Sequence, residues 1–167
     1  MTRANSFSKT LIMGGVFTVI ALLGLTFWYF KFASKPAIQQ TLAIIKPDAV
    51  AAGNSGKIID KIEQSGFKII AMKKTELTKE KAEEFYAIHK EKPFFGELVS
   101  FMISGPIVVL VLEKENAIEE WRKLMGKAEI EGTLRNLFGT SVTKNAVHGS
   151  DAPETAKVEI KQFFPEL

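Results

Sequence analysis

The sequence predicts an α/β (α+β) layered sandwich preceded by one transmembrane helix. Short apolar runs with strand character alternate along residues 37–167 with segments whose apolar residues recur at helical spacing. An uncharged apolar run precedes them at residues 11–30. The alternation argues against an all-β fold and a helical bundle, and no internal repeat or low-complexity segment interrupts it.

The N-terminal run has the length of a bilayer span. Leu11–Phe30 holds 20 residues without a charge, and as a helix with a rise of about 1.5 Å per residue it spans roughly 30 Å. Trp28 and Tyr29 stand at its end, where amphipathic rings favour the membrane interface. We therefore expect a tail with a transmembrane segment and linker over 1–36, and a separate domain over 37–167.

A cleaved export signal or organelle-targeting segment is the alternative for this tail. The apolar region of a signal peptide usually runs only about 7 to 15 residues, whereas this run is longer and ends in aromatic residues. An uncleaved anchor is therefore the favoured interpretation. Basic residues flank the run almost equally on both sides, so charge does not set its orientation.

The basic excess of the chain belongs to this tail. The formal charge is +3, with 22 basic and 19 acidic residues. The charged residues of 1–36 are all basic: Arg3, Lys9, Lys31 and Lys35. Removing these 4 from 22 leaves 18 basic against 19 acidic residues in the domain. A nearly neutral domain argues against a nucleic-acid partner.

The domain elements follow in chain order from apolar spacing, caps and turn residues. Its first half predicts a strand at 42–45 ending at Lys46, a helix from a Ser55 cap to Gly66, a strand at 67–77, and a helix capped by Thr78 that extends to His89. Its second half predicts helices at 94–103, 116–125 and 133–138, a central strand at 107–112, a short strand at 146–147 and a terminal helix at 153–163.

The sequence argues against a phosphate-binding loop and against cysteine-based sites. Gly53 to Lys57 has two residues between its glycines instead of the four of a phosphate-binding loop, and Ile58 replaces the required hydroxyl residue. Cysteine is absent, which excludes disulfides, thiolate zinc sites and cysteine nucleophiles, and leaves His89 and His148 as the imidazoles. His89 lies between Ile88 and a lysine on a predicted helix, so we expect a structural or solvated role.

His148 is a stronger candidate than His89 for a catalytic residue. It follows apolar residues that end a predicted strand, and we expect it on the loop before Gly149-Ser150-Asp151. Glu159 in the following helix can turn back to bind one ring nitrogen, which leaves the other as a nucleophile. Considered alone, this pattern fits a surface turn histidine more often than a catalytic one.

Several motifs, taken together in their order and spacing, favour a catalytic role for His148 over a surface turn. The strongest is Asn145-x-x-His148-Gly149-Ser150-Asp151. The others, in chain order, are Ile45-Lys46-Pro47-Asp48, Tyr86, Pro93-Phe94-Phe95, Ser104-Gly105-Pro106 and Gly132-Thr133-Leu134-Arg135. Together they resemble the nucleoside diphosphate kinase family from about Thr41 to Leu167, nearly the whole predicted domain.

The resemblance implies a ferredoxin-like βαββαβ sandwich with extra helices, and ping-pong transfer of a phosphoryl group from a nucleoside triphosphate to a diphosphate. It implies His148 as nucleophile, Glu159 and Ser150 as its supports, and Phe94 as the platform for the base, with Val142 opposite. It assigns phosphate and ribose binding to Lys46, Tyr86, Arg122, Arg135 and Asn145. It also implies a homo-oligomer and Mg²⁺ held mainly by the nucleotide phosphates, with Asp151 acting through water.

The chain departs from the family pattern in two places. Between Gly126 and Gly132 stand the five residues of 127–131, where most members have a longer loop with a phosphate-contacting threonine that also helps subunits to pack. Ala152 replaces a serine that is common after Gly-Ser-Asp. The nucleophile and its supports are retained.

Two functions follow. The first is an active kinase held at a membrane by a single-pass anchor, with the catalytic domain facing the cytoplasm, where nucleoside triphosphates are supplied. The alternative is a membrane-anchored nucleotide-binding interaction or regulatory module with little turnover. The retained His148 and its surrounding cations favour the kinase.

Overall fold

The computed structural model describes residues 37–167. The predicted transmembrane helix at 11–30 and most of the linker lie outside the described residues. Among residues 37–167, no helix combines the length and apolar character needed to cross a membrane.

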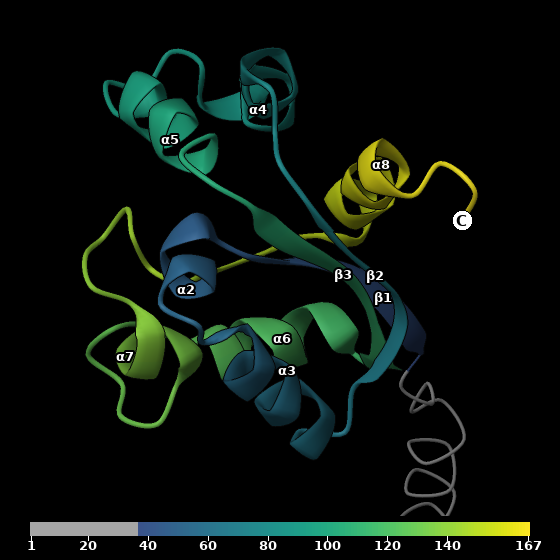
Figure 1. Cartoon of the computed structure of the whole chain (residues 1–167). Coiled ribbons are helices and arrows are strands. Elements are labelled where there is room, and N and C mark those ends of the chain that lie inside the picture. The colour runs from purple at the N-terminus through teal and green to yellow at the C-terminus, as the bar shows by residue number, and fades with distance from the viewer. Residues whose placement is uncertain (1–36) are drawn as a thin grey trace, which may run out of the picture. The chain divides into compact units, whose positions relative to one another are not determined.

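Residues Ile38–Leu167 form an α/β sandwich around one sheet (Figure 1). The elements in chain order are β1 (Ile38–Ile45), α2 (Pro47–Ala51), α3 (Ser55–Gln64), β2 (Lys68–Thr75), α4 (Lys79–Phe85), the 3-10 turn η1 (Ala87–His89), α5 (Phe95–Met102), β3 (Ile107–Glu115), α6 (Ala117–Met125), α7 (Leu134–Phe138), β4 (Val147–Gly149) and α8 (Pro153–Phe163). The strands lie in the order β2-β3-β1-β4, and every neighbouring pair is antiparallel. This topology confirms the predicted βαββαβ sandwich with extra helices.

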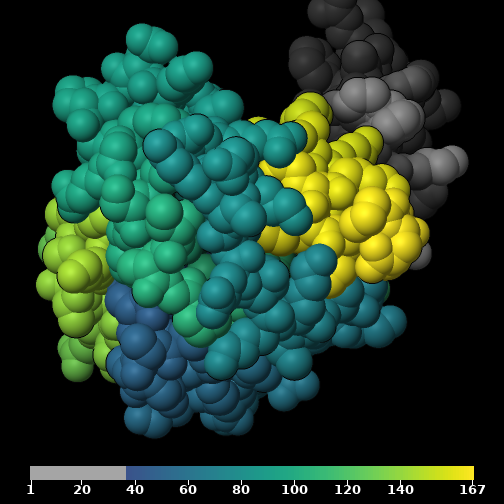
Figure 2. Space-filling model, turned by 45° about the horizontal axis from the view of Figure 1, so that its top comes forward, coloured from purple at the N-terminus to yellow at the C-terminus, as the bar shows by residue number. Residues whose placement is uncertain are grey.

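Side-chain alternation along the central strands builds two apolar layers. In β1, Leu42 and Ile44 face one side of the sheet while Ala43 and Ile45 face the other, and all four are fully buried. On the first side pack α4, α5 and α8; on the second pack α3 and α6 (Figure 1). Figure 2 shows the surface of α4, in teal, directly beside that of α8, in yellow. The central strands are therefore covered on both faces.

Most predicted elements are confirmed, with differences at their ends. Thr78 caps α4 as expected, because its hydroxyl accepts from the Lys81 N–H at 3.3 Å. The helix ends at Phe85, and the residues to His89 form the separate turn η1. Asn54 occupies the cap position predicted for Ser55, and its side chain makes no capping hydrogen bond there.

One short helix was missed, and the predicted place of His148 was wrong. Helix α2 has five residues with a proline at its start, too few to show helical periodicity. His148 lies within β4, not on the loop after a strand, and pairs with Ile44 of β1. Its neighbour Val147 is fully buried, which draws this three-residue strand onto the sheet edge.

Candidate active site

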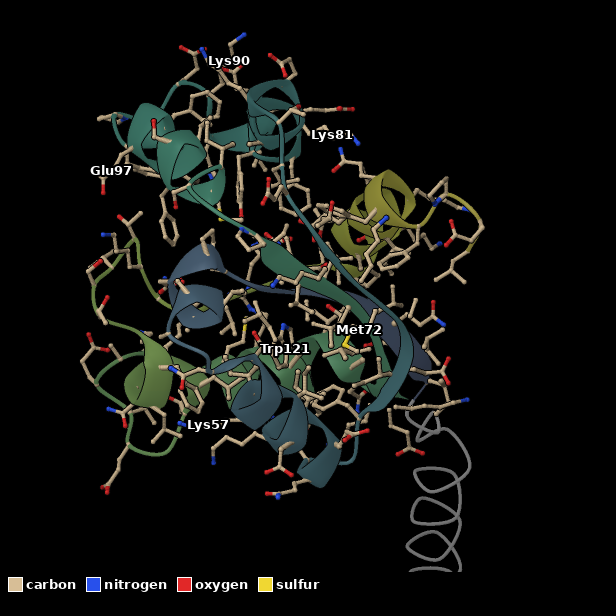
Figure 3. The ribbon with its side chains drawn as sticks, viewed as in Figure 1. Lys57, Met72, Lys81, Lys90, Glu97 and Trp121 are labelled. Carbon is tan, nitrogen blue, oxygen red and sulfur yellow. The ribbon has the colours of Figure 1, made fainter. Side chains whose placement is uncertain are left out.

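The His148 backbone, which is part of β4, is held from two sides, by β1 and by α6. Ile44 of β1 pairs with His148, and the Ser150 N–H extends the contact by donating to the Leu42 carbonyl at 3.2 Å. From α6, Trp121 Nε1 donates to the His148 carbonyl at 3.1 Å. Trp121 is fully buried beneath the sheet (Figure 3). The imidazole therefore extends from a fixed backbone.

Gly149 makes this close approach possible. A Cβ atom at position 149 would overlap the indole ring of Trp121, and it would also press on the Met125 methyl group. Only glycine leaves room for the tryptophan against the strand. The glycine of the sequence motif thus serves the packing of β4 on α6.

A carboxylate and a hydroxyl orient the imidazole. His148 Nε2 lies 3.3 Å from Glu159 Oε2, and Ser150 Oγ donates to the same oxygen at 2.6 Å. The Leu42 N–H donates to Ser150 Oγ at 3.2 Å. The carboxylate favours the tautomer with its proton on Nε2. Among residues 37–167, Nδ1 is then the ring nitrogen without a hydrogen bond.

Two aromatic rings enclose the histidine. Phe85 and Tyr86 meet the imidazole edge-on, with ring centroids 5.2 and 6.0 Å away. Burial, with a smaller contribution from Glu159, raises the pKa of Tyr86 above its ordinary value, so this phenol keeps its proton. Its hydroxyl is buried without a partner among the described residues, a costly state unless a ligand oxygen accepts from it.

Arg122 and Arg135 line the same space as His148. Arg135 donates from Nη1 to the Gly126 carbonyl at 3.3 Å and from Nη2 to the Val147 carbonyl at 3.4 Å. Burial and the nearby Arg122 lower the pKa of Arg135 from its usual value. A guanidinium remains charged even so. Two neighbouring cations whose charges repel each other favour an anionic ligand.

Lys46 follows β1 and lies almost entirely below the surface, with 7% of its area exposed. Its Nζ donates to Asn145 Oδ1 at 2.7 Å, and Asn145 Nδ2 donates to the Val142 carbonyl at 2.8 Å. Burial lowers the pKa of Lys46 to about 8; Arg135 contributes in the same direction and Asp48 opposes it. An anion bound nearby would hold the proton on this lysine.

Several of the side chains around His148 line a cavity of about 230 Å³. Its lining residues are Phe85, Tyr86, Ile88, His89, Arg122, Arg135, His148, Gly149, Asp151, Thr155 and Glu159. The structure thus brings together the predicted nucleophile, its carboxylate partner, Tyr86 and both arginines. Ser150 is fully buried and is connected to the cavity through its hydrogen bond to Glu159.

Four predicted binding residues lie outside the cavity lining. Lys46 and Asn145 form the pair already described. Phe94 is 48% exposed, and its ring centroid lies 5.7 Å from that of His89. Val142 is 93% exposed, so its side chain contacts little of the domain.

His89, for which the sequence predicts a structural or solvated role, lines the cavity. Its ring stacks on Tyr86 at 6.5 Å and lies beside Phe94. The three-residue spacing from Tyr86 was the available signal, since residues three apart eclipse in a 3-10 turn. The sequence instead predicts one continuous α-helix from Thr78 to His89.

Asp151 adds an exposed carboxylate to the cavity. Thr155 Oγ1 donates to its Oδ1 at 2.6 Å, and this hydrogen bond is the main reason that the pKa of Asp151 is lowered. In the part of the chain from 37 to 167, no group of three or more His, Cys, Asp or Glu side chains could hold a metal ion. A divalent cation at this place would therefore need most of its ligands from a bound substrate.

The arrangement suits one kind of chemistry. An imidazole with its Nε2 held and its Nδ1 open can act as a nucleophile. Nearby guanidinium groups neutralise the charge of a polyphosphate and of a loose phosphoryl-transfer transition state. The cavity therefore supports attack of His148 on a phosphorus atom.

Comparisons with known proteins agree with this chemistry. The family model described as nucleoside diphosphate kinase matches residues 39–167. A nucleoside diphosphate kinase of Geotalea uraniireducens is 57% identical over 134 residues, which cover 78% of this chain and 98% of that protein. One of Persephonella marina is 54% identical over 136 residues, covering 78% of this chain and 96% of the relative.

Solved structures show the same similarity in three dimensions. The nucleoside diphosphate kinase of Aquifex aeolicus superimposes with a TM-score of 0.75 at 47% identity, covering 77% of this chain and 96% of that one. A halophilic nucleoside diphosphate kinase of Halobacterium salinarum in complex with CDP gives 0.73 at 36% identity, covering 77% and 88%.

Proposed function

The chain belongs to the nucleoside diphosphate kinase family, and we propose that His148 carries the phosphoryl group in its reaction. The enzyme transfers the γ-phosphoryl group of a nucleoside triphosphate to a nucleoside diphosphate. The observation that supports His148 most strongly is its open Nδ1 in a cavity lined by two arginines. A regulatory module with little turnover is not favoured.

In the first half-reaction, the Nδ1 lone pair of His148 forms a bond to the γ-phosphorus. The bond from this phosphorus to the bridging oxygen breaks, and its electron pair leaves with the nucleoside diphosphate. The ring becomes positive while Nε2 keeps its proton. Glu159, 3.3 Å from Nε2, stabilises that charge, and Ser150 holds the carboxylate in place.

In the second half-reaction, a terminal β-phosphate oxygen of another nucleoside diphosphate attacks the same phosphorus. The bond from nitrogen to phosphorus breaks, and its electron pair returns to Nδ1. The groups that stabilise charge in the first step do so again, because the second step is the chemical reverse of the first. The enzyme therefore alternates between free and phosphorylated forms.

The remaining site residues receive roles as substrate binders. Arg122, Arg135 and Lys46 supply the positive charge for the phosphates, and the Tyr86 hydroxyl, which has no partner among residues 37–167, supplies a donor. The exposed face of Phe94 suits stacking of a base without reading its edge, so every nucleobase would be accepted. Val142 would cover the other face of that base. Asn145 would bind phosphate or ribose together with Lys46, to which it is hydrogen-bonded.

Magnesium fits this site as a cation carried by the substrate. Bound to the phosphates, Mg²⁺ neutralises their charge. The exposed Asp151 carboxylate stands at the cavity and keeps its charge because Thr155 donates to it. Asp151 would interact with the ion through water.

Steady-state kinetics test the proposed cycle. The initial rate is measured against the triphosphate concentration at several fixed concentrations of diphosphate. A phosphoenzyme cycle gives parallel double-reciprocal lines, whereas direct transfer in a ternary complex gives lines that intersect. Intersecting lines would overturn the carrier role of His148 and leave the overall activity intact.

The membrane anchor is a proposal of its own, supported by the uncharged run Leu11–Phe30. The domain would face the cytoplasm, where its nucleotide substrates are made. Cells that produce the full chain are fractionated, and the membranes are washed with alkaline carbonate. Retention of the chain in the washed membranes supports an anchor, and its release contradicts one. Proteolysis of intact cells should leave the domain uncut.

Self-association is proposed from the edge of the sheet. Strand β2 has a neighbour on one side only in the described sheet, and Met72 on it is 51% exposed (Figure 3). An open edge can pair with another copy of the chain. The short loop 127–131 limits contacts elsewhere, so light scattering of the detergent-solubilised protein is needed to give the subunit number. A monomeric mass would contradict the proposal.

A further inference from the structure

We propose that Asp48 is a positioning residue for phosphoryl transfer: its carboxylate holds the backbone of Ala146, two residues before His148, in a left-handed conformation. The inference rests on the proposed role of His148. Asp48 belongs to the Lys46-Pro47-Asp48 motif of the sequence, in which only Lys46 has a role so far. Its contact with Ala146 joins residues 98 apart in the chain.

The backbone at Ala146 is strained. Its φ angle is 65°, a value that a residue with a Cβ atom rarely adopts. The Val147 N–H donates to the Asn145 carbonyl at 2.7 Å, which closes a tight three-residue turn around Ala146. Such a conformation persists only where the surroundings enforce it.

The segment after β1 supplies that support through both peptide groups of Ala146. Asp48 Oδ2 accepts from the Ala146 N–H at 3.0 Å. The Ala146 carbonyl accepts from the Lys46 N–H at 2.8 Å. Ala146 is fully buried, so water cannot replace either contact. The two hydrogen bonds fix the peptide planes on both sides of the strained residue.

The turn connects several groups of the proposed site. Asn145, on one side of Ala146, binds Lys46 Nζ at 2.7 Å. The Val147 carbonyl, on the other side, accepts from Arg135 at 3.4 Å. His148 follows directly. If the turn relaxed, Asn145 would move relative to Lys46 and the start of β4 would rotate, so phosphate binding and the nucleophile would be misplaced together.

Asp48 also keeps a polar atom in an unfavourable state. Its Oδ1 is buried and has no hydrogen-bond partner among the described residues. A carboxylate selected only for stability would satisfy both oxygens. The cost is consistent with a residue retained for the geometry that Oδ2 imposes.

The test uses four variants of the full chain: Asp48→Ala, Asp48→Asn, Ala146→Gly and the double variant Asp48→Ala with Ala146→Gly. We expect Asp48→Ala to lower kcat/KM on the order of 10- to 100-fold, since small misplacements of reacting groups cost that much. Asp48→Asn keeps an oxygen acceptor and should retain most of the activity. The double variant should recover activity, because glycine adopts the left-handed conformation without support.

Gly56→Ala provides the matched control for a purely structural effect. Gly56 lies in α3 with open space around its Cβ position, so alanine there should stabilise the domain far from the turn. Combined with Asp48→Ala, it should raise the melting temperature without restoring kcat/KM. Recovery with Gly56→Ala equal to that with Ala146→Gly would overturn the positioning role, as would full activity of Asp48→Ala.

Failure of the proposed function gives a different result. Wild-type protein and His148→Ala are labelled with γ-labelled nucleoside triphosphate in the same series. Unlabelled wild type, or a labelled His148→Ala, contradicts the role of His148. A labelled wild type with an unaffected Asp48→Ala contradicts the role of Asp48 alone.

Discussion

Lys46 is a cation held in a place that disfavours its charge. It is nearly buried, burial lowers its pKa to about 8, and its hydrogen-bond partner Asn145 is neutral. Asp48 counters the shift and Arg135 adds to it. The proposed contact with substrate phosphates would compensate for this cost, so the protonation state of Lys46 should be visible in catalysis.

The protonation state of Lys46 should control substrate capture as the pH changes. Free enzyme binds phosphate best with Lys46 protonated, which holds below a pH of about 8. Above that pH, kcat/KM for a nucleoside triphosphate, the substrate of the free enzyme, should fall, approaching about tenfold for each pH unit. Lys46→Arg keeps its charge and should show a flat profile over the same range, whatever its absolute rate. A wild-type profile that stays flat to pH 9.5 would contradict the phosphate role of Lys46.

Deprotonation of Lys46 should lower substrate capture but raise the stability of the folded domain. The folded-state pKa of about 8 lies below the ordinary value of 10.5, so the unfolded chain binds more protons between these pH values. The contribution of Lys46 to the free energy of unfolding therefore rises from pH 8 to 10.5. Lys46→Met lacks this contribution, and the difference in melting temperature between wild type and variant measures it. A difference that does not change with pH would contradict the buried titration.

Glu159 should act on the chemical step more than on binding. Glu159→Gln keeps the shape of the side chain and removes the charge opposite Nε2 of His148. We expect kcat to fall by about 10- to 100-fold, a typical effect of losing a group that orients a reactive side chain. KM should change little, because the side-chain hydrogen bonds of Glu159 in the described structure go to His148 and Ser150. Rapid-quench measurement of phosphoenzyme formation separates these effects, and an unchanged rate would contradict the orienting role.

At this scale the sequence was sufficient to predict that His148, Glu159 and Ser150 lie together, because all three fall within 12 residues of one another. It was insufficient for His89 and Asp48. His89 required the 3-10 turn that stacks it on Tyr86. Asp48 required a contact between residues 98 apart. No local pattern contains such a contact.

Among the elements, β4 is the shortest strand of the described sheet and depends most on its neighbours. It has three residues, pairs with β1 on one side, and receives the Trp121 hydrogen bond from α6. The position of β4 is fixed by this packing and not by an intrinsic strand preference of its residues.

Glycine substitutions test that dependence. Gly149→Ala places a methyl group where the Trp121 indole lies and should destabilise the domain by about 1–3 kcal/mol, the usual cost of overpacking. Gly56→Ala, in open space on α3, should instead stabilise it by about 0.4–1 kcal/mol. Urea unfolding of both variants gives the comparison. Equal effects of the two substitutions would show that Trp121 does not constrain β4.

The elements predicted best were a strand buried on both sides and a helix marked by a proline at its start. Strand β3 was visible as a β-branched apolar run, and α8 was predicted with its observed bounds from Pro153 to Phe163. Helix α2 and the break after Phe85 were missed, because one or two turns carry too little periodicity to be recognised.

On the scale of the whole molecule, sheet order decides where the site forms. Strand β4 joins β1 across more than 100 residues, and this pairing brings His148 beside the residues that follow β1. Alternating elements in the sequence indicated the class of fold but not this neighbour. The candidate cavity forms where α4, η1, α6, α7 and α8 meet beside β4.

Charge is also organised at this scale. The basic excess of the full sequence lies in its first 36 residues, and the rest of the chain is nearly neutral. The cations proposed to bind the phosphates are local, with Arg122 and Arg135 at the cavity and Lys46 hydrogen-bonded to Asn145. Under that proposal, recognition of a polyphosphate depends on the placement of these cations and not on net charge.

The most direct test of the account locates the phosphoryl group. Full-length protein is incubated with γ-labelled nucleoside triphosphate and Mg²⁺, then digested under alkaline conditions that preserve phosphohistidine. The labelled peptide is sequenced, and the isomer is identified by ³¹P NMR. We expect acid-labile label on Nδ1 of His148, released to added nucleoside diphosphate and absent from His148→Ala. Label on Nε2, on another residue, or retained by His148→Ala would contradict it.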